Sequence, residues 1–139
     1  MVRKIAFVSC VSKKADQEKP AQDLYTSSWF QKASKYAKLN SDNWYILSAK
    51  HGIVDPDEVI APYDETLNEM GVDQRQAWGR DVARELEEVL QPGDQVILLA
   101  GQRYREFLLE PLRILGCDVK IPMRGLRIGE QMSWLNERI

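Results

Sequence analysis

Residues 44–52 read Trp-Tyr-Ile-Leu-Ser-Ala-Lys-His-Gly, an apolar run that ends abruptly in a polar turn. The run from Trp44 to Ala49 is apolar almost throughout, which is typical of a central parallel strand that is covered on both faces. Gly52 permits a positive φ and therefore a sharp change of chain direction. The stretch predicts a buried strand followed directly by a tight turn, and this turn carries the only histidine of the chain, His51.

Similar apolar runs lie on either side of this stretch. Lys4–Ser9 and Gln95–Ala100 predict two more strands, and Val119–Ile121 predicts a short fourth strand. Residues 50–68 read as a long irregular segment because Pro56 and Pro62 interrupt them. Helical spacing of apolar residues or a helix-start signal predicts helices over these ranges: Ser28–Leu39, Asp73–Leu90, Gly101 to near Leu115, and Gly125–Arg138. The alternation predicts a three-layer α/β/α fold with a four-stranded, mainly parallel sheet.

The length and composition set further expectations. A chain of 139 residues fits a single domain spanning 1–139, and its net charge of -2 supplies no overall basic field. The apolar start is too short to cross a bilayer, so we expect a cytoplasmic protein without membrane contact. Cys10 and Cys117 make no disulfide framework, and with a lone histidine they do not form a zinc-site pattern. No metal and no cofactor is expected.

Polar residues follow three of the predicted strands. Ligands of parallel sheets bind beyond the carboxyl ends of the strands, so we expect these three junctions to converge on one crevice. The first junction contains Ser9, Cys10, Ser12 and Lys13, which could bind a phosphate or a polymer backbone. The glycine spacing of a Walker loop is missing. Cys10 could act as a nucleophile beside a base, or it could simply be a buried small residue next to solvated lysines.

The second junction holds the strongest candidates for catalysis. His51 can donate or accept a proton, Lys50 adds a positive charge, and Gly52 shapes the turn. Further along, Tyr63 could stack on a base while Asp64 bonds its edge. The alternatives are that His51 only bonds a backbone carbonyl, and that Tyr63 covers the edge of the core while Asp64 caps a turn.

The third junction begins a predicted helix at Gly101, Gln102, Arg103 and Tyr104. Arg103 and the free backbone N–H groups suit an anion, and Tyr104 adds a stacking surface. Arg127, near the C-terminus, could also contact a phosphate. The alternative is an ordinary surface helix with charged residues in water.

Several of these stretches resemble known families. A family of small bacterial and phage domains of unknown function is similar over most of the chain, in these ranges: Phe7–Lys14, Leu24–Phe30, Leu47–Pro56 and Ile60–Leu67. Ser48–Gly52 and Pro62–Asp64 also resemble the YaaA peroxide-stress family, which is associated with DNA binding, although YaaA proteins more often have an aromatic residue at the place of His51. A more distant resemblance is to a domain of archaeosine-type tRNA-modification enzymes, which implies a fold like that of uracil-DNA glycosylase.

Three functions are compatible with these residues. The leading expectation is a hydrolase that acts on a nucleobase or nucleic acid at an N-glycosidic bond, with His51 or Lys50 stabilising the leaving base and Asp64 orienting water. Ser9, Ser12, Lys13, Arg103 and Arg127 would then hold phosphates. The second is a DNA-, RNA- or nucleotide-binding module without catalysis. The third is a small interaction protein that dimerises through the aromatic stripe of its first long helix.

Overall fold

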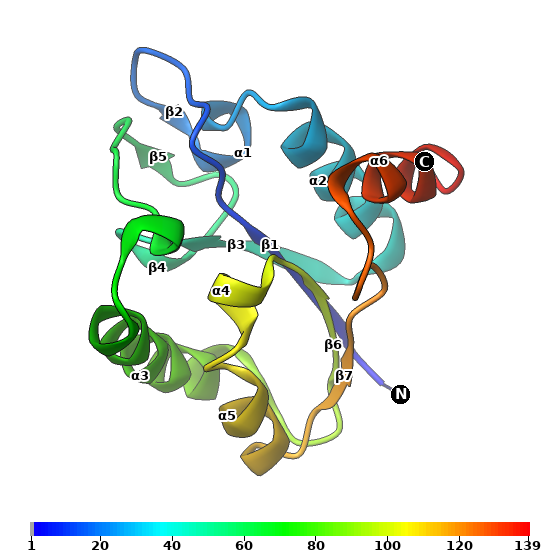
Figure 1. The fold of residues 1–139 in the computed structure, drawn as a ribbon. Helices are drawn as coiled ribbons and strands as arrows, with labels where there is room; N and C mark the ends of the chain where they lie inside the picture. The colour runs from blue at the N-terminus through cyan, green and yellow to red at the C-terminus, as the bar shows by residue number, and fades with distance from the viewer. Residues whose placement is uncertain (1) are drawn as a thin grey trace.

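Five strands form the central sheet, in the order β4-β3-β1-β6-β7 (Figure 1). The computed structural model describes residues 2–139. All neighbouring pairs are parallel except β3 and β4. The strands have these bounds: β1 Lys4–Ser9, β3 Asn43–Ser48, β4 Gly52–Val54, β6 Gln95–Leu99 and β7 Asp118–Lys120. A separate antiparallel pair joins β2 (Lys19–Pro20) to β5 (Val59–Ile60).

The expectation of four strands was wrong, because β4 adds a fifth. Gly52 adopts a φ of 74°, which turns the chain back so that Ile53 pairs with Leu47. The backbone N–H of Ile53 then donates to the Glu85 carboxylate from a neighbouring helix. A strand of three residues is too short to show a period in the sequence, so its pairing depends on the turn and on this long-range bond.

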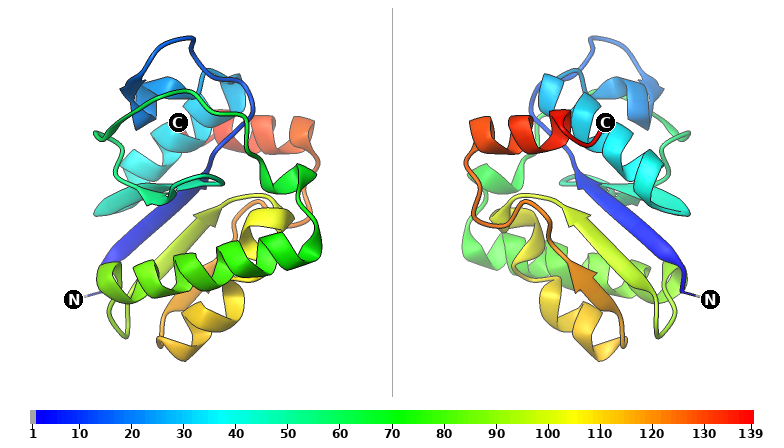
Figure 2. Two further views of the ribbon diagram at one scale, coloured as in Figure 1. Left: turned by 90° about the vertical axis from the view of Figure 1, so that its left-hand side faces the viewer. Right: turned by 90° about the vertical axis from the view of Figure 1, so that its right-hand side faces the viewer.

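Helices cover both faces of the sheet, as predicted (Figure 2). On one face lie α2 (Ser28–Asn40) and α6 (Ile128–Asn136). On the other lie α3 (Val72–Val89), α4 (Gln102–Arg105) and α5 (Leu109–Ile114). Two short elements complete the chain, namely α1 (Ala21–Leu24) and the 3-10 turn η1 (Leu67–Glu69). No helix of residues 2–139 is long and apolar enough to cross a bilayer.

The single helix expected from Gly101 to near Leu115 is divided into α4 and α5. Pro111 lies inside the first turn of α5, where its ring cannot donate a hydrogen bond and clashes with a continuing helix before it. Between the two helices, Glu106 accepts a hydrogen bond of 2.9 Å from Nε of Arg75 on α3. The interruption turns α5 toward β7, with which it packs.

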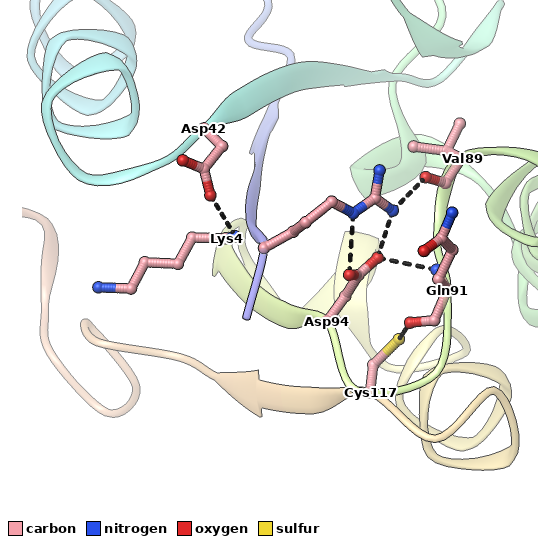
Figure 3. Close-up of polar contacts among 7 residues, drawn as sticks. Lys4, Asp42, Val89, Gln91, Asp94 and Cys117 are labelled. Carbon is pink, nitrogen blue, oxygen red and sulfur yellow. Dashed lines mark hydrogen bonds and ion pairs between the residues drawn. The ribbon is translucent and has the colours of Figure 1, made fainter. Parts of the chain in front are cut away.

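Polar contacts hold the amino ends of the strands together (Figure 3). Asp94, just before β6, accepts two hydrogen bonds from the Arg3 guanidinium at 3.0 and 2.6 Å, and one from the Gln91 N–H at 2.8 Å. The hydrogen bonds from Arg3 hold the pKa of Asp94 below its ordinary value. Asp42, just before β3, accepts from the Lys4 N–H at 2.8 Å. These contacts stabilise the amino ends of the strands. The candidate site lies at the opposite end of the sheet, beyond the carboxyl ends of the strands.

Candidate functional site

The topology places a switch point between β1 and β6. The chain leaves β1 through α2 to reach β3 on one side, and it leaves β6 through α4 and α5 to reach β7 on the other side. The two crossovers lie on opposite faces of the sheet (Figure 1). Loops therefore separate beyond the carboxyl ends of β1 and β6, and this is where open α/β sheets bind ligands.

A cavity of about 280 Å³ lies at this switch point, and we call it the crevice. Its walls come from the end of β1 and the loop after it, from α2, from η1 and the residue before it, from the start of α4 and from the start of α6. The lining residues are Ser9, Cys10, Val11, Ser12, Trp29, Thr66, Asn68, Gly101, Tyr104, Ile128 and Gln131. All of them are uncharged, and several carry hydrogen-bonding groups.

Ser9 contributes a buried serine to the crevice, with 5% of the residue exposed. Among residues 2–139 every fully buried side-chain nitrogen or oxygen has a hydrogen-bond partner. The Ser9 hydroxyl makes no hydrogen bond within that range, so its oxygen is accessible to a molecule in the crevice it lines. An accessible hydroxyl without a protein partner can donate a hydrogen bond to, or accept one from, a molecule in the crevice.

Trp29 and Gln131 form a fixed wall on the helical side. The indole Nε1 of Trp29 donates to Gln131 Oε1 at 2.8 Å, and Gln131 Nε2 donates to the Leu126 carbonyl at 2.9 Å. Both amide atoms of Gln131 are thereby oriented, and with them the plane of the indole. The wall presents an aromatic ring beside an amide in a defined direction.

Tyr104 closes the opposite wall. Its hydroxyl accepts a hydrogen bond from the Leu67 N–H at 3.3 Å and lies 3.3 Å from both Thr66 Oγ1 and Cys10 Sγ. Burial raises the pKa of Tyr104, so the phenol stays neutral at ordinary pH. Tyr104 thus links two other crevice residues, Cys10 and Thr66, that lie far apart in the sequence. Cys10 is only 5% exposed, and its hydrogen-bonding neighbour is this phenol.

A second group of buried hydroxyls, which we call the hydroxyl cluster, lies beside the crevice. Ser48 Oγ accepts the backbone N–H groups of Lys50 and His51 at 3.2 and 3.0 Å. Its own proton is donated to Tyr63 Oη at 2.7 Å, and Tyr63 Oη lies 2.5 Å from Tyr25 Oη. Burial raises the pKa of both phenols. The cluster therefore holds the Lys50-His51 turn in place through its backbone.

Lys14 and His51 cover the ring of Tyr63. Nζ of Lys14 lies 4.4 Å from the ring centroid, and the imidazole of His51 meets the ring edge-on with centroids 5.4 Å apart. Partial burial lowers the pKa of the Lys14 ammonium. Tyr63 is itself 7% exposed, so its ring forms part of the core edge and is no open stacking platform.

The structure brings together only part of the set expected from the sequence. Five of the expected residues line the crevice: Ser9, Cys10, Ser12, Gly101 and Tyr104. Four are exposed and adjacent in sequence to lining residues: Lys13, Gln102, Arg103 and Arg127. Lys50, His51 and Asp64 are exposed and do not line the crevice, while Gly52 is buried in the turn before β4.

Six lining residues were not expected from the sequence, namely Val11, Trp29, Thr66, Asn68, Ile128 and Gln131. Trp29 lies on α2 and is only half-buried. Thr66 and Asn68 belong to the irregular segment, and Gln131 lies one turn into the last helix. No local pattern distinguishes these residues, because their placement depends on helices and loops that meet only in the fold.

The fold and the crevice define a small α/β protein with a ligand-sized site at the switch point. The chain belongs to a family of unknown function, DUF6884, whose profile matches residues 5–137. It is 30% identical over 116 residues to the uncharacterized protein YfjM of Bacillus subtilis (strain 168), covering 77% of this chain and 75% of YfjM. The crystal structure of AF0587, a protein of unknown function, is similar in fold over all of this chain with a TM-score of 0.53 at 15% identity. The chain spans 45% of that protein's length.

Proposed function

We propose that this protein binds a nucleobase in the crevice, as part of a nucleotide or of a nucleic acid strand. The observation that carries the proposal is a crevice lined only by uncharged residues and flanked by exposed cations. A charged ligand group would need a partner inside, so the part that enters is neutral. The volume of about 280 Å³ lies just below the range for drug-sized ligands, which suits a single base better than a larger molecule.

The crevice walls match the two kinds of contact that bases make. Trp29 offers an aromatic surface for a planar ring, whereas the ring of Tyr104 is 4% exposed and closes the wall rather than serving as a stacking platform. The Ser9 hydroxyl and the amides of Asn68 and Gln131 offer donors and acceptors for the polar edge of a base. These groups come from elements on both faces of the sheet, so a ring between them would be held from several directions.

The cations are placed to contact phosphate outside the crevice. Lys13 follows Ser12, Arg103 lies between Gly101 and Tyr104, and Arg127 precedes Ile128; all three are exposed. Phosphate contacts supply affinity without sequence information, while the base edge supplies selectivity. This arrangement supports recognition of a nucleotide rather than of a free base alone.

A binding experiment with a matched control tests the proposal. Nucleosides, nucleotides and short oligonucleotides are titrated by calorimetry against the wild-type protein, Ser9→Ala and Ser133→Ala. Ser133 is an exposed serine of α6, so its variant should bind like wild type. Ser9→Ala should weaken binding about 5- to 10-fold, which corresponds to the loss of one hydrogen bond of about 1 kcal/mol. No binding of any of these ligands by the wild type would contradict the proposal.

Hydrolysis at an N-glycosidic bond is the second candidate. Asp64 lies two residues before Thr66, on the loop that Tyr104 ties to the crevice. A carboxylate there could orient a water molecule, with Lys50 or His51 stabilising the leaving base. As part of this second candidate, we propose that the chain is related to YaaA proteins and has a fold related to that of uracil-DNA glycosylase.

Base release measured by mass spectrometry separates the two candidates. If the protein is a hydrolase, Asp64→Asn should abolish release and retain binding, while Glu87→Gln, an exposed control on α3, should leave both unchanged. His51→Ala should likewise lose turnover and stay folded. If the ligands were recovered intact after prolonged incubation with the wild type, hydrolysis would be excluded and the protein would be a binding module without catalysis.

A further inference from the structure

We propose that the crevice continues into a second subsite beside β7, so that the protein binds a single-stranded polynucleotide across both. This inference rests on the proposed function, since it extends the same base-binding site. It names the partner as a single-stranded polynucleotide, gives the path of the strand over the surface, and assigns a role to arginines that do not line the crevice.

A small hollow between the two subsites shares lining residues with each of them. A small hollow of about 30 Å³ shares Trp29, Gly101 and Gln131 with the crevice. The same hollow shares Ile121 with a groove of about 370 Å³ beside β7. Figure 2 (right) shows β7 at the edge of the sheet, between α5 and α6. The shared residues place the hollow next to both the crevice and the groove, so an extended ligand that reaches past Ile121 would contact both subsites.

The groove combines an apolar floor with cations. Leu109, Val119 and Ile121 provide the floor, and Arg113 and Arg124 lie beside it. Proteins that bind single strands use this combination, because bases cover apolar or aromatic surface while the backbone follows positive charge. Arg113 already pairs with Glu110, so Arg124 is the cation of the groove that a phosphate would engage.

Arg105 adds a second cation between the groove and the crevice. It lines the small hollow, and its Nη1 donates to the Ala100 carbonyl at the end of β6 at 2.8 Å. Burial and the nearby Arg124 lower the pKa of Arg105. Neither arginine forms an ion pair with a carboxylate within residues 2–139. Two neighbouring guanidinium groups without an acid suit a phosphate, which accepts several charge-assisted hydrogen bonds.

Acidic residues on the η1 side of the crevice indicate which way the strand runs over the surface. Asp64, Glu65 and Glu69 are exposed on the segment that carries Thr66 and Asn68. A phosphate backbone is repelled there and attracted toward Arg105 and Arg124. An acidic peptide fits the surface less well, because β7 has only three residues on which to add a strand, and the aromatic and amide groups of the crevice match base edges.

Length-dependent binding tests this inference. Fluorescence anisotropy competition compares oligodeoxythymidylates of one to about eight nucleotides at about 50 and about 200 mM salt. The wild type should bind oligonucleotides more tightly than the mononucleotide, with a steeper salt dependence. Arg124→Gln should weaken oligonucleotide binding about 5- to 10-fold and leave mononucleotide binding unchanged. Arg80→Gln, an exposed arginine on α3, should match wild type for both.

The outcomes separate the inference from the proposed function. Equal affinity for the mononucleotide and the octamer, or an Arg124→Gln variant that binds oligonucleotides like wild type, would overturn the second subsite and leave the crevice proposal intact. Binding of neither ligand would overturn both. A hexaglutamate peptide that competes as well as the oligonucleotide would assign the surface to acidic peptides and overturn the polynucleotide. Thermal melting of each variant confirms that it is folded.

Discussion

Replacing Tyr63 with phenylalanine tests whether the hydroxyl cluster stabilises the fold beside the crevice. Ser48 is fully buried, and its Oγ already accepts the N–H groups of Lys50 and His51. Its proton therefore goes to Tyr63 Oη, and Tyr63→Phe removes that acceptor. The same change removes the partner of Tyr25 Oη, and Tyr25 is 1% exposed.

The expected cost follows from these two lost contacts. A hydrogen bond contributes about 1 kcal/mol, and leaving a buried hydroxyl without a partner costs about 1 to 3 kcal/mol. We therefore expect Tyr63→Phe to lower the free energy of unfolding by about 2 to 4 kcal/mol, a large share of the roughly 5 to 15 kcal/mol of a domain. In Tyr25→Phe/Tyr63→Phe both phenols lose their hydroxyls, so its cost should be about 1 kcal/mol less than the sum of the single changes.

Urea denaturation of the wild type, Tyr25→Phe, Tyr63→Phe and the double variant measures these free energies of unfolding, with Tyr45→Phe as the control. The hydroxyl of Tyr45 makes no hydrogen bond within residues 2–139, so this variant should stay within about 0.5 kcal/mol of wild type. The reasoning would be refuted if Tyr63→Phe were no more destabilising than Tyr45→Phe, or if the single changes at positions 25 and 63 were additive.

Three further predictions concern pH and backbone geometry. Because burial raises the pKa of the two clustered phenols above their ordinary value of 10.0, stability should be complete below pH 10 and fall as pH rises beyond it, and Tyr25→Phe/Tyr63→Phe should flatten this fall in urea titrations. The pKa of Asp94 is lowered, so its contribution should be present above the ordinary value of 3.8 and fade as pH falls through the folded value; Asp94→Asn should cost about 2 kcal/mol at neutral pH and less in acid. Gly52→Ala should lower the free energy of unfolding by about 1 to 2 kcal/mol, because φ is 74° and the added Cβ meets the Glu85 carboxylate. Adding Glu85→Ala to this variant should restore only the part of that loss that is due to the steric contact. Full rescue of the stability would argue against backbone strain at position 52. Thermal melts of single and double variants measure both parts.

The sequence predicted the principal strands because their signal is local. The runs at Lys4–Ser9 and Gln95–Ala100 are apolar enough to be recognised singly, and both are strands in the structure, the second ending one residue earlier at Leu99. The sequence indicated a helix capped by Asp73 and reaching Leu90, whereas α3 spans Val72–Val89 with Gly71 as its N-cap, so Asp73 lies inside the first turn. β4 and the division between α4 and α5 depend on a turn, a proline and contacts with α3, so the local apolar pattern did not reveal them.

The candidate site shows the same division between local and long-range information. The rule that ligands bind beyond the carboxyl ends of strands directed attention to Ser9, Cys10, Gly101 and Tyr104, which do line one crevice. The rule identifies the strand-to-loop junctions as candidates, but it does not say which of these junctions lie next to one another in the fold. It is the strand order that brings the ends of β1 and β6 to the crevice, and the Lys50-His51 turn stays outside its lining.

By itself the sequence determined the α/β class, the apolar strands and several residues of the site, because side-chain polarity along a strand or helix follows directly from which face is buried. The tertiary structure alone decided that Trp29, Thr66 and Gln131 face the crevice, and that Tyr25, Ser48 and Tyr63 share one buried cluster. These residues are separated by tens of positions, so their contacts arise from the packing of whole elements. That packing depends on the summed contacts of the core, which no short stretch of the chain encodes.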